Sequence, residues 1–279
     1  MSDSEAEVLR RTVFCVSDHT GVTAETFAHS LMSRFESVAP AYITRPFVDT
    51  VEKARELVDE IDQVAGTGER PIVFSTLTDK VLWDVLHESE ALVLGMFEFF
   101  VDRLSSELDV EASKGVGRYH SINDTATYQL RLDAVDFALM TDDGVGLRHY
   151  PAADVVLVGV SRVGKTPTCL YLSMQYGIRA ANYPLTVDDP SVTQLPEAIA
   201  ALRDRLFGLT IDPIRLHQIR QKRRPDSPYS SLERCTEEVG RAERLLRSNG
   251  VATLDTTARS IEEITATIIE EADLVRRLG

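Results

Sequence analysis

Short apolar runs alternate with amphipathic stretches along the chain, and most runs end at glycine, proline or polar residues. In the first part of the chain, strands are predicted at 12–16, 41–47 and 71–75. Helices are predicted at 23–35, 50–64 and 79–89, where apolar residues recur at helical spacing. Strands that alternate with helices in this way are typical of parallel sheets. The pattern therefore predicts an α/β fold with mostly parallel sheets.

The later part of the chain continues the alternation. Further strands are predicted at 155–158, 178–185, 206–213 and 251–255, and further helices at 128–139, 197–207, 214–222, 231–249 and 261–278. The apolar residues at 93–97 and 99–108 are interpreted as core or interface, and the polar stretch 113–128 as a loop. A chain of 279 residues is long enough for two cores. We expect an N-terminal α/β domain at 1–150 and a second domain at 151–279.

The strand at 155–158 leads into an octet that matches the phosphate-binding pattern Gly, four residues, Gly-Lys-Thr. The octet is Gly159, Val160, Ser161, Arg162, Val163, Gly164, Lys165 and Thr166. Its glycines let the backbone approach an anion, so that N–H groups converge on phosphate at the start of the following helix. Lys165 then reaches the terminal phosphate and Thr166 can bind magnesium. The sequence predicts a P-loop, with Lys165 facing solvent while the loop is empty; the alternative is a simple strand-to-helix turn.

Carboxylates and arginines near predicted strand ends are further candidates. Asp18 follows the first strand, at the sheet edge where such folds bind ligands, although this turn could simply cap a helix. Asp143 belongs to an Asp-Asp-Gly turn, which could equally be solvated. Asp212 ends a strand from which a carboxylate can hold magnesium. Arg223 and Arg224 belong, with Arg220 and Lys222, to the densest basic cluster, interpreted either as a phosphate clamp or as a solvated helix face.

Composition and charge narrow the class of protein. Hydrophobic residues make up 43% and charged residues 27%, as in ordinary globular proteins. No apolar run is long enough to cross a membrane, and the acidic start at 1–7 lacks the signal-peptide pattern, so we expect a cytoplasmic protein without a membrane partner. The net charge of −14 disfavours nucleic acid as a partner. Cys15, Cys169 and Cys235 lie too far apart to suggest a disulfide framework or a zinc site.

Taken together, these motifs resemble the family of regulatory proteins of phosphoenolpyruvate synthase and of pyruvate, phosphate dikinase. The main matching stretches are 159–162, 165–168, 171–172, 177–184 and 207–213. Weaker matches are 16–18 with 23–25, Tyr128 with Arg131, and 142–144, so the resemblance covers nearly the whole chain. The residue before Lys165 is Gly164 rather than a serine, and in this the octet resembles the synthase branch of the family. The sequence departs from the family pattern at His19, a position where a small residue is expected.

The resemblance implies a bifunctional enzyme that acts on phosphoenolpyruvate synthase as its protein partner. Such an enzyme is a threonine kinase with ADP, rather than ATP, as donor, and a pyrophosphorylase that removes the phosphate with inorganic phosphate. In this interpretation the octet, with Lys165, holds the nucleotide phosphates. Thr166 and Asp212 organise Mg²⁺, and Asp143 or Asp18 accepts the threonine proton. The residues themselves do not show the ADP preference, and whether the target is the synthase or the dikinase and whether the chain forms a homodimer are left open.

Two other classes of function remain compatible with the octet alone. One is a P-loop kinase or nucleoside triphosphatase that acts on a small molecule. The other is a non-catalytic module that senses a nucleotide and recruits a partner. Turnover without a protein acceptor would distinguish the first, and binding without phosphoryl transfer the second.

Overall fold

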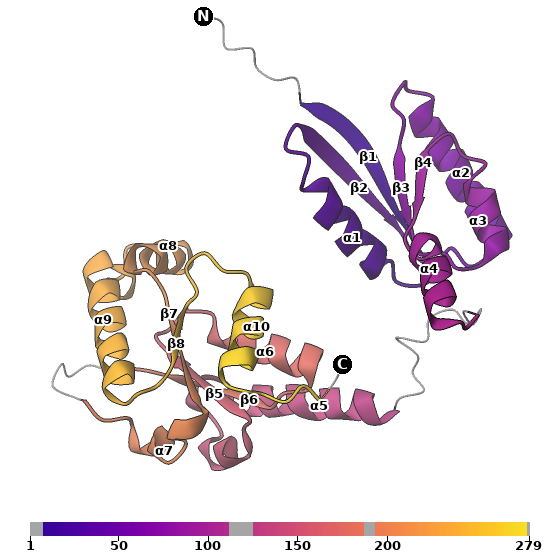
Figure 1. Ribbon diagram of the computed structural model, residues 1–279. Coiled ribbons are helices and arrows are strands. Elements are labelled where there is room, and N and C mark those ends of the chain that lie inside the picture. The colour runs from indigo at the N-terminus through magenta and orange to yellow at the C-terminus, as the bar shows by residue number, and fades with distance from the viewer. Residues whose placement is uncertain (1–7, 112–124, 187–192, 278–279) are drawn as a thin grey trace, which may run out of the picture. The chain divides into compact units, whose positions relative to one another are not determined.

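The computed structural model describes residues 8–111, 125–186 and 193–277 of the chain. The chain divides into two compact units, 1–121 and 122–279 (Figure 1). Each unit is built on a four-stranded sheet in which every strand pair is parallel. The predicted α/β class with mostly parallel sheets is confirmed.

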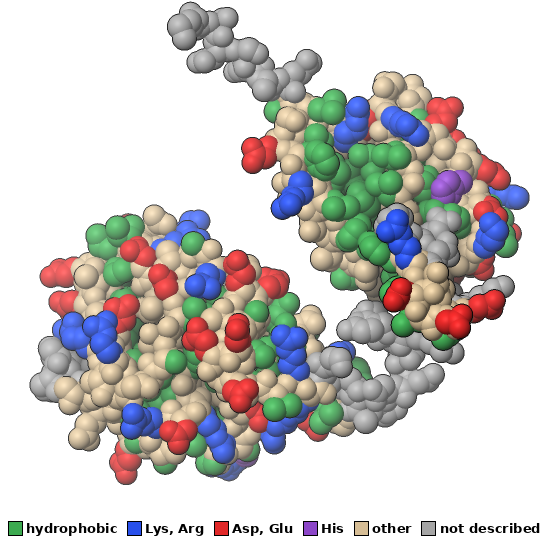
Figure 2. Space-filling view, in the orientation of Figure 1, with side chains coloured by type: hydrophobic (Ala, Val, Ile, Leu, Met, Phe, Trp, Pro, Cys, Tyr) green, Lys and Arg blue, Asp and Glu red, His purple; other side chains and the backbone are tan. Residues whose placement is uncertain are grey.

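The first unit alternates strands and helices from its start. Its elements are β1 (Leu9–Val16), α1 (Val22–Met32), β2 (Val38–Arg45), α2 (Val51–Ala65), β3 (Ile72–Ser75), α3 (Lys80–Leu86), β4 (Leu92–Gly95) and α4 (Glu98–Leu108). Successive side chains of β1 point to opposite faces of the sheet. Val13 and Cys15 join the core beneath α1, whereas Phe14 and Val16 join the core beneath α2 and α3. Figure 2 shows hydrophobic side chains gathered over the part of this unit where α1 lies beside the strands.

The second unit has more elements, several of them short. They are α5 (Thr125–Met140), the 3₁₀ turns η2 (Asp142–Gly144) and η3 (Leu147–Ala152), β5 (Val155–Gly159), α6 (Lys165–Tyr176), β6 (Ala180–Pro184), α7 (Glu197–Ala200), η4 (Arg203–Arg205), β7 (Leu206–Thr210), α8 (Pro213–Arg223), η5 (Pro228–Ser230), α9 (Leu232–Ser248), β8 (Thr253–Asp255) and α10 (Ile261–Glu271). Every residue of β5 is buried, as expected for a strand covered on both faces. α5 packs against α6 and β6 and so belongs to this unit, although we expected the second domain to begin at 151.

The two sheets share one strand order. The order is β2-β1-β3-β4 in the first unit and β6-β5-β7-β8 in the second. In both, the first strand of the unit lies between its successor and the third strand, so the chain connections diverge at its carboxyl end. This switch point is where open α/β sheets bind ligands. The segment after β1 carries Asp18, and the segment after β5 is the phosphate-loop octet.

Three single elements differ from the sequence pattern or lie partly outside the described residues. The apolar run at 93–97, interpreted as core or interface, overlaps the edge strand β4, whose residues alternate between exposed and partly buried. The helix predicted at 197–207 is wrong beyond Ala200, because Arg205 donates hydrogen bonds to the carbonyls of Pro151 and Ala153 and the chain turns there into β7. The loop predicted at 113–128 lies mostly outside the described residues, and α5 already begins at Thr125.

Candidate active site

The phosphate-loop octet joins β5 to α6 with the backbone geometry of an anion site. Gly164 has φ 100° and precedes the first residue of α6, and no side chain caps that helix start. The first N–H groups of α6 are therefore open to a ligand, which the positive end of the helix dipole favours when it is an anion. A Cβ atom at Gly164 would meet nothing within 4 Å, whereas one at Gly159 would lie 2.3 Å from the carbonyl oxygen of Leu209. Gly159 thus permits close packing of the strands, and Gly164 leaves space above the loop.

Lys165 is buried at the floor of the loop. Its side chain is only 5% exposed, and its ammonium donates hydrogen bonds of 3.0 Å to the carbonyls of Gly159 and Val160. Burial lowers the pKa of Lys165 to about 8, although the nearby charge of Asp143 opposes this shift. The prediction that Lys165 faces solvent is wrong, because the loop wraps around the amine and supplies its hydrogen-bond acceptors.

Asp142 and Thr166 meet beside the lysine. The Thr166 hydroxyl donates a hydrogen bond of 2.8 Å to a carboxylate oxygen of Asp142. The side-chain amide of Asn182, on β6, donates to the same Asp142 oxygen, and its own oxygen accepts a hydrogen bond of 3.0 Å from the Asp143 N–H. Asn182 is almost fully buried, so it fixes both the Asp142 carboxylate and the turn that carries Asp143. The turn places Asp143 at φ 50°, a conformation that aspartate tolerates better than most residues.

These groups border one cavity of about 540 Å³. It is lined by Asp142, Asp143, Ser161, Arg162, Gly164, Lys165, Thr166 and Pro167. A carboxylate and a hydroxyl suit magnesium, which takes oxygen ligands and keeps several of its waters. Within the described ranges, no three His, Cys, Asp or Glu side chains group as a metal site, so the cation would rely on phosphate and water oxygens as well. This donor set fits Mg²⁺ together with a nucleotide.

The remaining sequence candidates lie elsewhere. Asp212 begins α8, where its carboxylate accepts hydrogen bonds from the N–H groups of Ile214 and Arg215. Arg223 ends α8 and Arg224 follows it, both with exposed side chains that do not line the 540 Å³ cavity. Asp18 belongs to the first unit, with its carboxylate 3.1 Å from Nδ1 of His19. The structure therefore brings together Asp143, Lys165 and Thr166, with Asp142 as the carboxylate that contacts Thr166.

Arg220 on α8 holds the phosphate loop through a contact with Ser161. It is fully buried, donates a hydrogen bond of 3.1 Å to the carbonyl of Ser161, and forms an ion pair of 2.7 Å with Glu238 on α9. Its guanidinium lies 4.1 Å from the ring centre of Tyr229, whose hydroxyl donates to the Ser161 hydroxyl at 2.9 Å. Sequence reasoning placed Arg220 in the basic cluster and missed this role. Asn182 was missed as well, although a polar residue within an apolar strand pattern was a usable signal.

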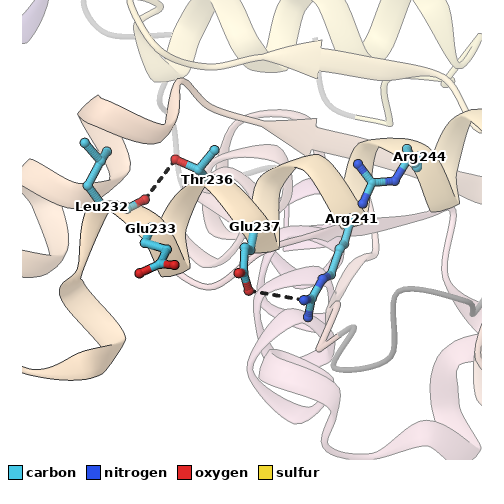
Figure 3. A pocket seen from close by; sticks show the side chains of 6 residues that line it. All are labelled: Leu232, Glu233, Thr236, Glu237, Arg241 and Arg244. Atoms are coloured by element: carbon cyan, nitrogen blue, oxygen red, sulfur yellow. Dashed lines mark hydrogen bonds and ion pairs between the residues drawn. The ribbon is translucent and has the colours of Figure 1, made fainter.

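A further hollow lies on the outer surface of α9 (Figure 3). It is lined by Leu232, Glu233, Thr236, Glu237, Arg241 and Arg244. Three of its polar side chains are engaged within the helix: Arg241 pairs with Glu237 at 3.1 Å, and the Thr236 hydroxyl donates a hydrogen bond to the carbonyl of Leu232. This hollow is a charged helix face rather than a site with converging chemical groups.

The comparisons with known proteins agree with this geometry. A family model described as kinase/pyrophosphorylase matches residues 13–269. The chain belongs to the kinase/pyrophosphorylase family. The resemblance found in the sequence is thereby confirmed, and membership of this family supports a phosphoryl-transfer activity.

Similar proteins match over nearly their full length. A protein of Stutzerimonas stutzeri is 48% identical over 97% of this chain and 100% of its own. A protein of Halorhodospira halophila is 52% identical over 96% and 98%, and one of Burkholderia vietnamiensis is 49% identical over 95% and 98%. Each bears the name "Putative phosphoenolpyruvate synthase regulatory protein".

No helix among the described residues is long and apolar enough to cross a membrane.

Proposed function

We propose that this kinase/pyrophosphorylase regulates phosphoenolpyruvate synthase by reversible phosphorylation of a threonine. In one direction a nucleotide transfers its terminal phosphoryl group to the threonine oxygen. The family resemblance implies that this nucleotide is ADP, which then leaves as AMP. In the other, inorganic phosphate attacks the phosphothreonine and leaves as pyrophosphate. The observation that carries the proposal is the convergence of Lys165, Thr166 and the Asp142–Asp143 pair on one cavity at the end of β5.

Each of these side chains has a role that its position supports. The N–H groups of 161–166 and the Lys165 ammonium bind the phosphates, because they present positive charge at a helix start. Thr166 and Asp142 would hold Mg²⁺, which would screen the charge of the phosphate oxygens. The Asp143 carboxylate accepts the threonine proton. Of the other candidates, Asp18 is an alternative base, Asp212 could hold the water shell of Mg²⁺, and Arg223 and Arg224 could close over the phosphates.

One site serves both directions in this proposal. Each direction moves a phosphoryl group between the threonine oxygen and a phosphate oxygen, so that the same charge develops in both transition states. The N–H groups at the start of α6 have no side-chain cap and are held in place for this charge, which is the arrangement that stabilises a transition state. The N-terminal unit is then available for recognition of the protein substrate.

The test uses purified phosphoenolpyruvate synthase as acceptor, with ADP and ATP in parallel. We expect mass spectrometry to locate a phosphoryl group on one synthase threonine with ADP, and added inorganic phosphate to remove it with release of pyrophosphate. Phosphorylation of a small metabolite alone would favour a small-molecule kinase. Nucleotide binding without any transfer would favour a sensing module, and either result would contradict the proposal.

A further inference from the structure

A second cavity of about 340 Å³ adjoins the phosphate loop. It shares Arg162, Gly164 and Pro167 with the cavity that contains the aspartates. Its other walls come from α8, the segment after β7, the segment after β8 and α10. The loop therefore has two adjoining cavities that meet at the same three residues, and a ligand anchored at the loop could extend into either one.

The chemistry of the two cavities differs. The first holds the carboxylates of Asp142 and Asp143 and the oxygen atoms suited to a metal. The second is lined by the aliphatic side chains Ile211, Ile219 and Ile264, with Arg215, Thr257 and Arg259 among its polar groups. Aliphatic walls favour the faces of a planar heterocycle, whereas guanidinium and hydroxyl groups suit its polar edge and a pentose. A volume of this size lies within the range of about 300–1,000 Å³ that is usual for small-molecule sites.

Hydrogen bonds hold the second cavity in shape. The Thr256 hydroxyl lies 3.2 Å from the carbonyl of Val163, in the phosphate loop, and 3.0 Å from the carbonyl of Thr210, at the end of β7. The backbone N–H of Asp212, at the start of α8, donates a hydrogen bond of 2.8 Å to the Thr257 hydroxyl. The loop after β8 is thus tied both to the phosphate loop and to α8. A preformed wall of this kind lowers the ordering cost of binding.

We propose that this second cavity receives the base and ribose of the donor nucleotide. The nucleotide then lies across Gly164, with its nucleoside between α8 and α10 and its terminal phosphate on the Asp142 side. The proposal rests on the proposed function only in taking a nucleotide as donor. It also has a consequence for the two reactions, because the phosphate-dependent direction uses no nucleoside and leaves this cavity empty.

The test compares ADP with pyrophosphate, which lacks a nucleoside, by titration calorimetry. Ile219→Glu places a carboxylate in the aliphatic wall, and Ile214→Glu is the matched control on an exposed position of the same helix. Arg259→Glu reverses the charge of an exposed side chain and keeps the test valid if Ile219→Glu fails to fold. We expect both Ile219→Glu and Arg259→Glu to weaken ADP binding at least about tenfold and pyrophosphate binding less than about threefold. Ile219→Glu places an unpaired carboxylate in the aliphatic wall, which is costly to bury, and Arg259→Glu replaces a donor for the polar edge of the nucleoside with an acidic group. Ile214→Glu should change neither.

The outcomes separate this inference from the proposed function. Equal loss of ADP and pyrophosphate binding, or unchanged ADP binding in both variants, overturns the nucleoside site even if the wild-type protein phosphorylates the synthase. Selective loss of ADP binding supports the nucleoside site even if no phosphoryl transfer is found, in which case only the proposed function fails.

Discussion

Thr166 donates a hydrogen bond of 2.8 Å to Asp142, although the two residues come from segments on opposite sides of β5 in the sequence. Thr166 lies in the first turn of α6, and Asp142 lies in the turn that leads toward β5. Their contact places a carboxylate next to the phosphate loop without contribution from the strand end at Asp212. The arrangement makes Asp142 the leading candidate for a magnesium ligand.

The first prediction compares Asp142→Asn with Asp212→Asn. We expect Asp142→Asn to lower the transfer rate by a factor of about 10²–10³, or roughly 3–4 kcal/mol, because a preorganised charge is lost, and to raise the Mg²⁺ concentration needed for half-maximal rate. Asp212→Asn should keep the cap of α8, since asparagine caps helices as well as aspartate does. Rates measured across a Mg²⁺ titration check this. A larger loss in Asp212→Asn would restore Asp212 as the main metal ligand.

The second prediction concerns pH. The pKa of Lys165 is lowered to about 8, so the amine loses its proton as pH rises through that value in the free protein. A bound phosphate chain favours the charged amine and raises its pKa, so binding above pH 8 requires proton uptake. We therefore expect ADP affinity to be constant between about pH 7 and 8, where the terminal phosphate has passed its second pKa of about 6, and to fall above pH 8. Calorimetry in buffers of different ionisation enthalpy measures the uptake, and Lys165→Ala should abolish it; a flat profile up to pH 10 contradicts the assigned burial.

The third prediction separates the two loop glycines. Gly159→Ala should destabilise the fold by about 3 kcal/mol, because the new Cβ would press on the carbonyl of Leu209. Gly164→Ala meets no protein atom within 4 Å and should cost only about 1 kcal/mol for its left-handed backbone, while its methyl group obstructs bound phosphate. Urea denaturation and an ADP-binding assay measure the two effects. Equal stability loss in both variants would contradict the packing described for β5 and β7.

The fourth prediction concerns the arginines of α8. Arg220→Met should lower the free energy of unfolding by about 2–3 kcal/mol, because it removes the buried donor to Ser161 and one of the two ion pairs of Glu238, which keeps its pair with Arg234. Arg223→Met is the matched control and should change it by less than about 0.5 kcal/mol, since that side chain is exposed. Chemical denaturation monitored by circular dichroism checks both. Similar losses in the two variants would mean that the contacts of Arg220 with Ser161 and Glu238 contribute little to the stability of the fold.

Sequence periodicity predicts most of this fold because buried parallel strands are continuous apolar runs. β5 and the octet after it are examples, since local spacing determines both. The edge strand β4 is not a continuous buried run, because half of its residues are exposed, and so the sequence pattern does not identify it as a strand. The helix predicted at 197–207 is wrong because distant carbonyls hold Arg205, a contact between segments far apart in the sequence.

The site is predictable only in part for the same reason. The octet predicts which residues would surround a phosphate, but the Asp142–Thr166 contact depends on how Asn182 on β6 positions the turn before β5. The burial of Lys165 depends on the path of the loop around it. The exposed Arg223 and the buried Arg220 are indistinguishable by charge, and only the packing of α8 against α9 separates them. Tertiary contacts, rather than local pattern, assign these roles.

The most direct measurement of the central claim follows one labelled phosphoryl group through the reverse reaction. Synthase that carries ³²P on the regulated threonine is incubated with unlabelled inorganic phosphate and either wild-type protein or Lys165→Ala. The threonine O–P bond breaks and a bond to a phosphate oxygen forms, so the account predicts label in pyrophosphate with the wild type and loss of both directions in Lys165→Ala. Label released as inorganic phosphate, or a reverse reaction that survives in Lys165→Ala while phosphorylation is lost, would contradict a single phosphate-loop site for both reactions.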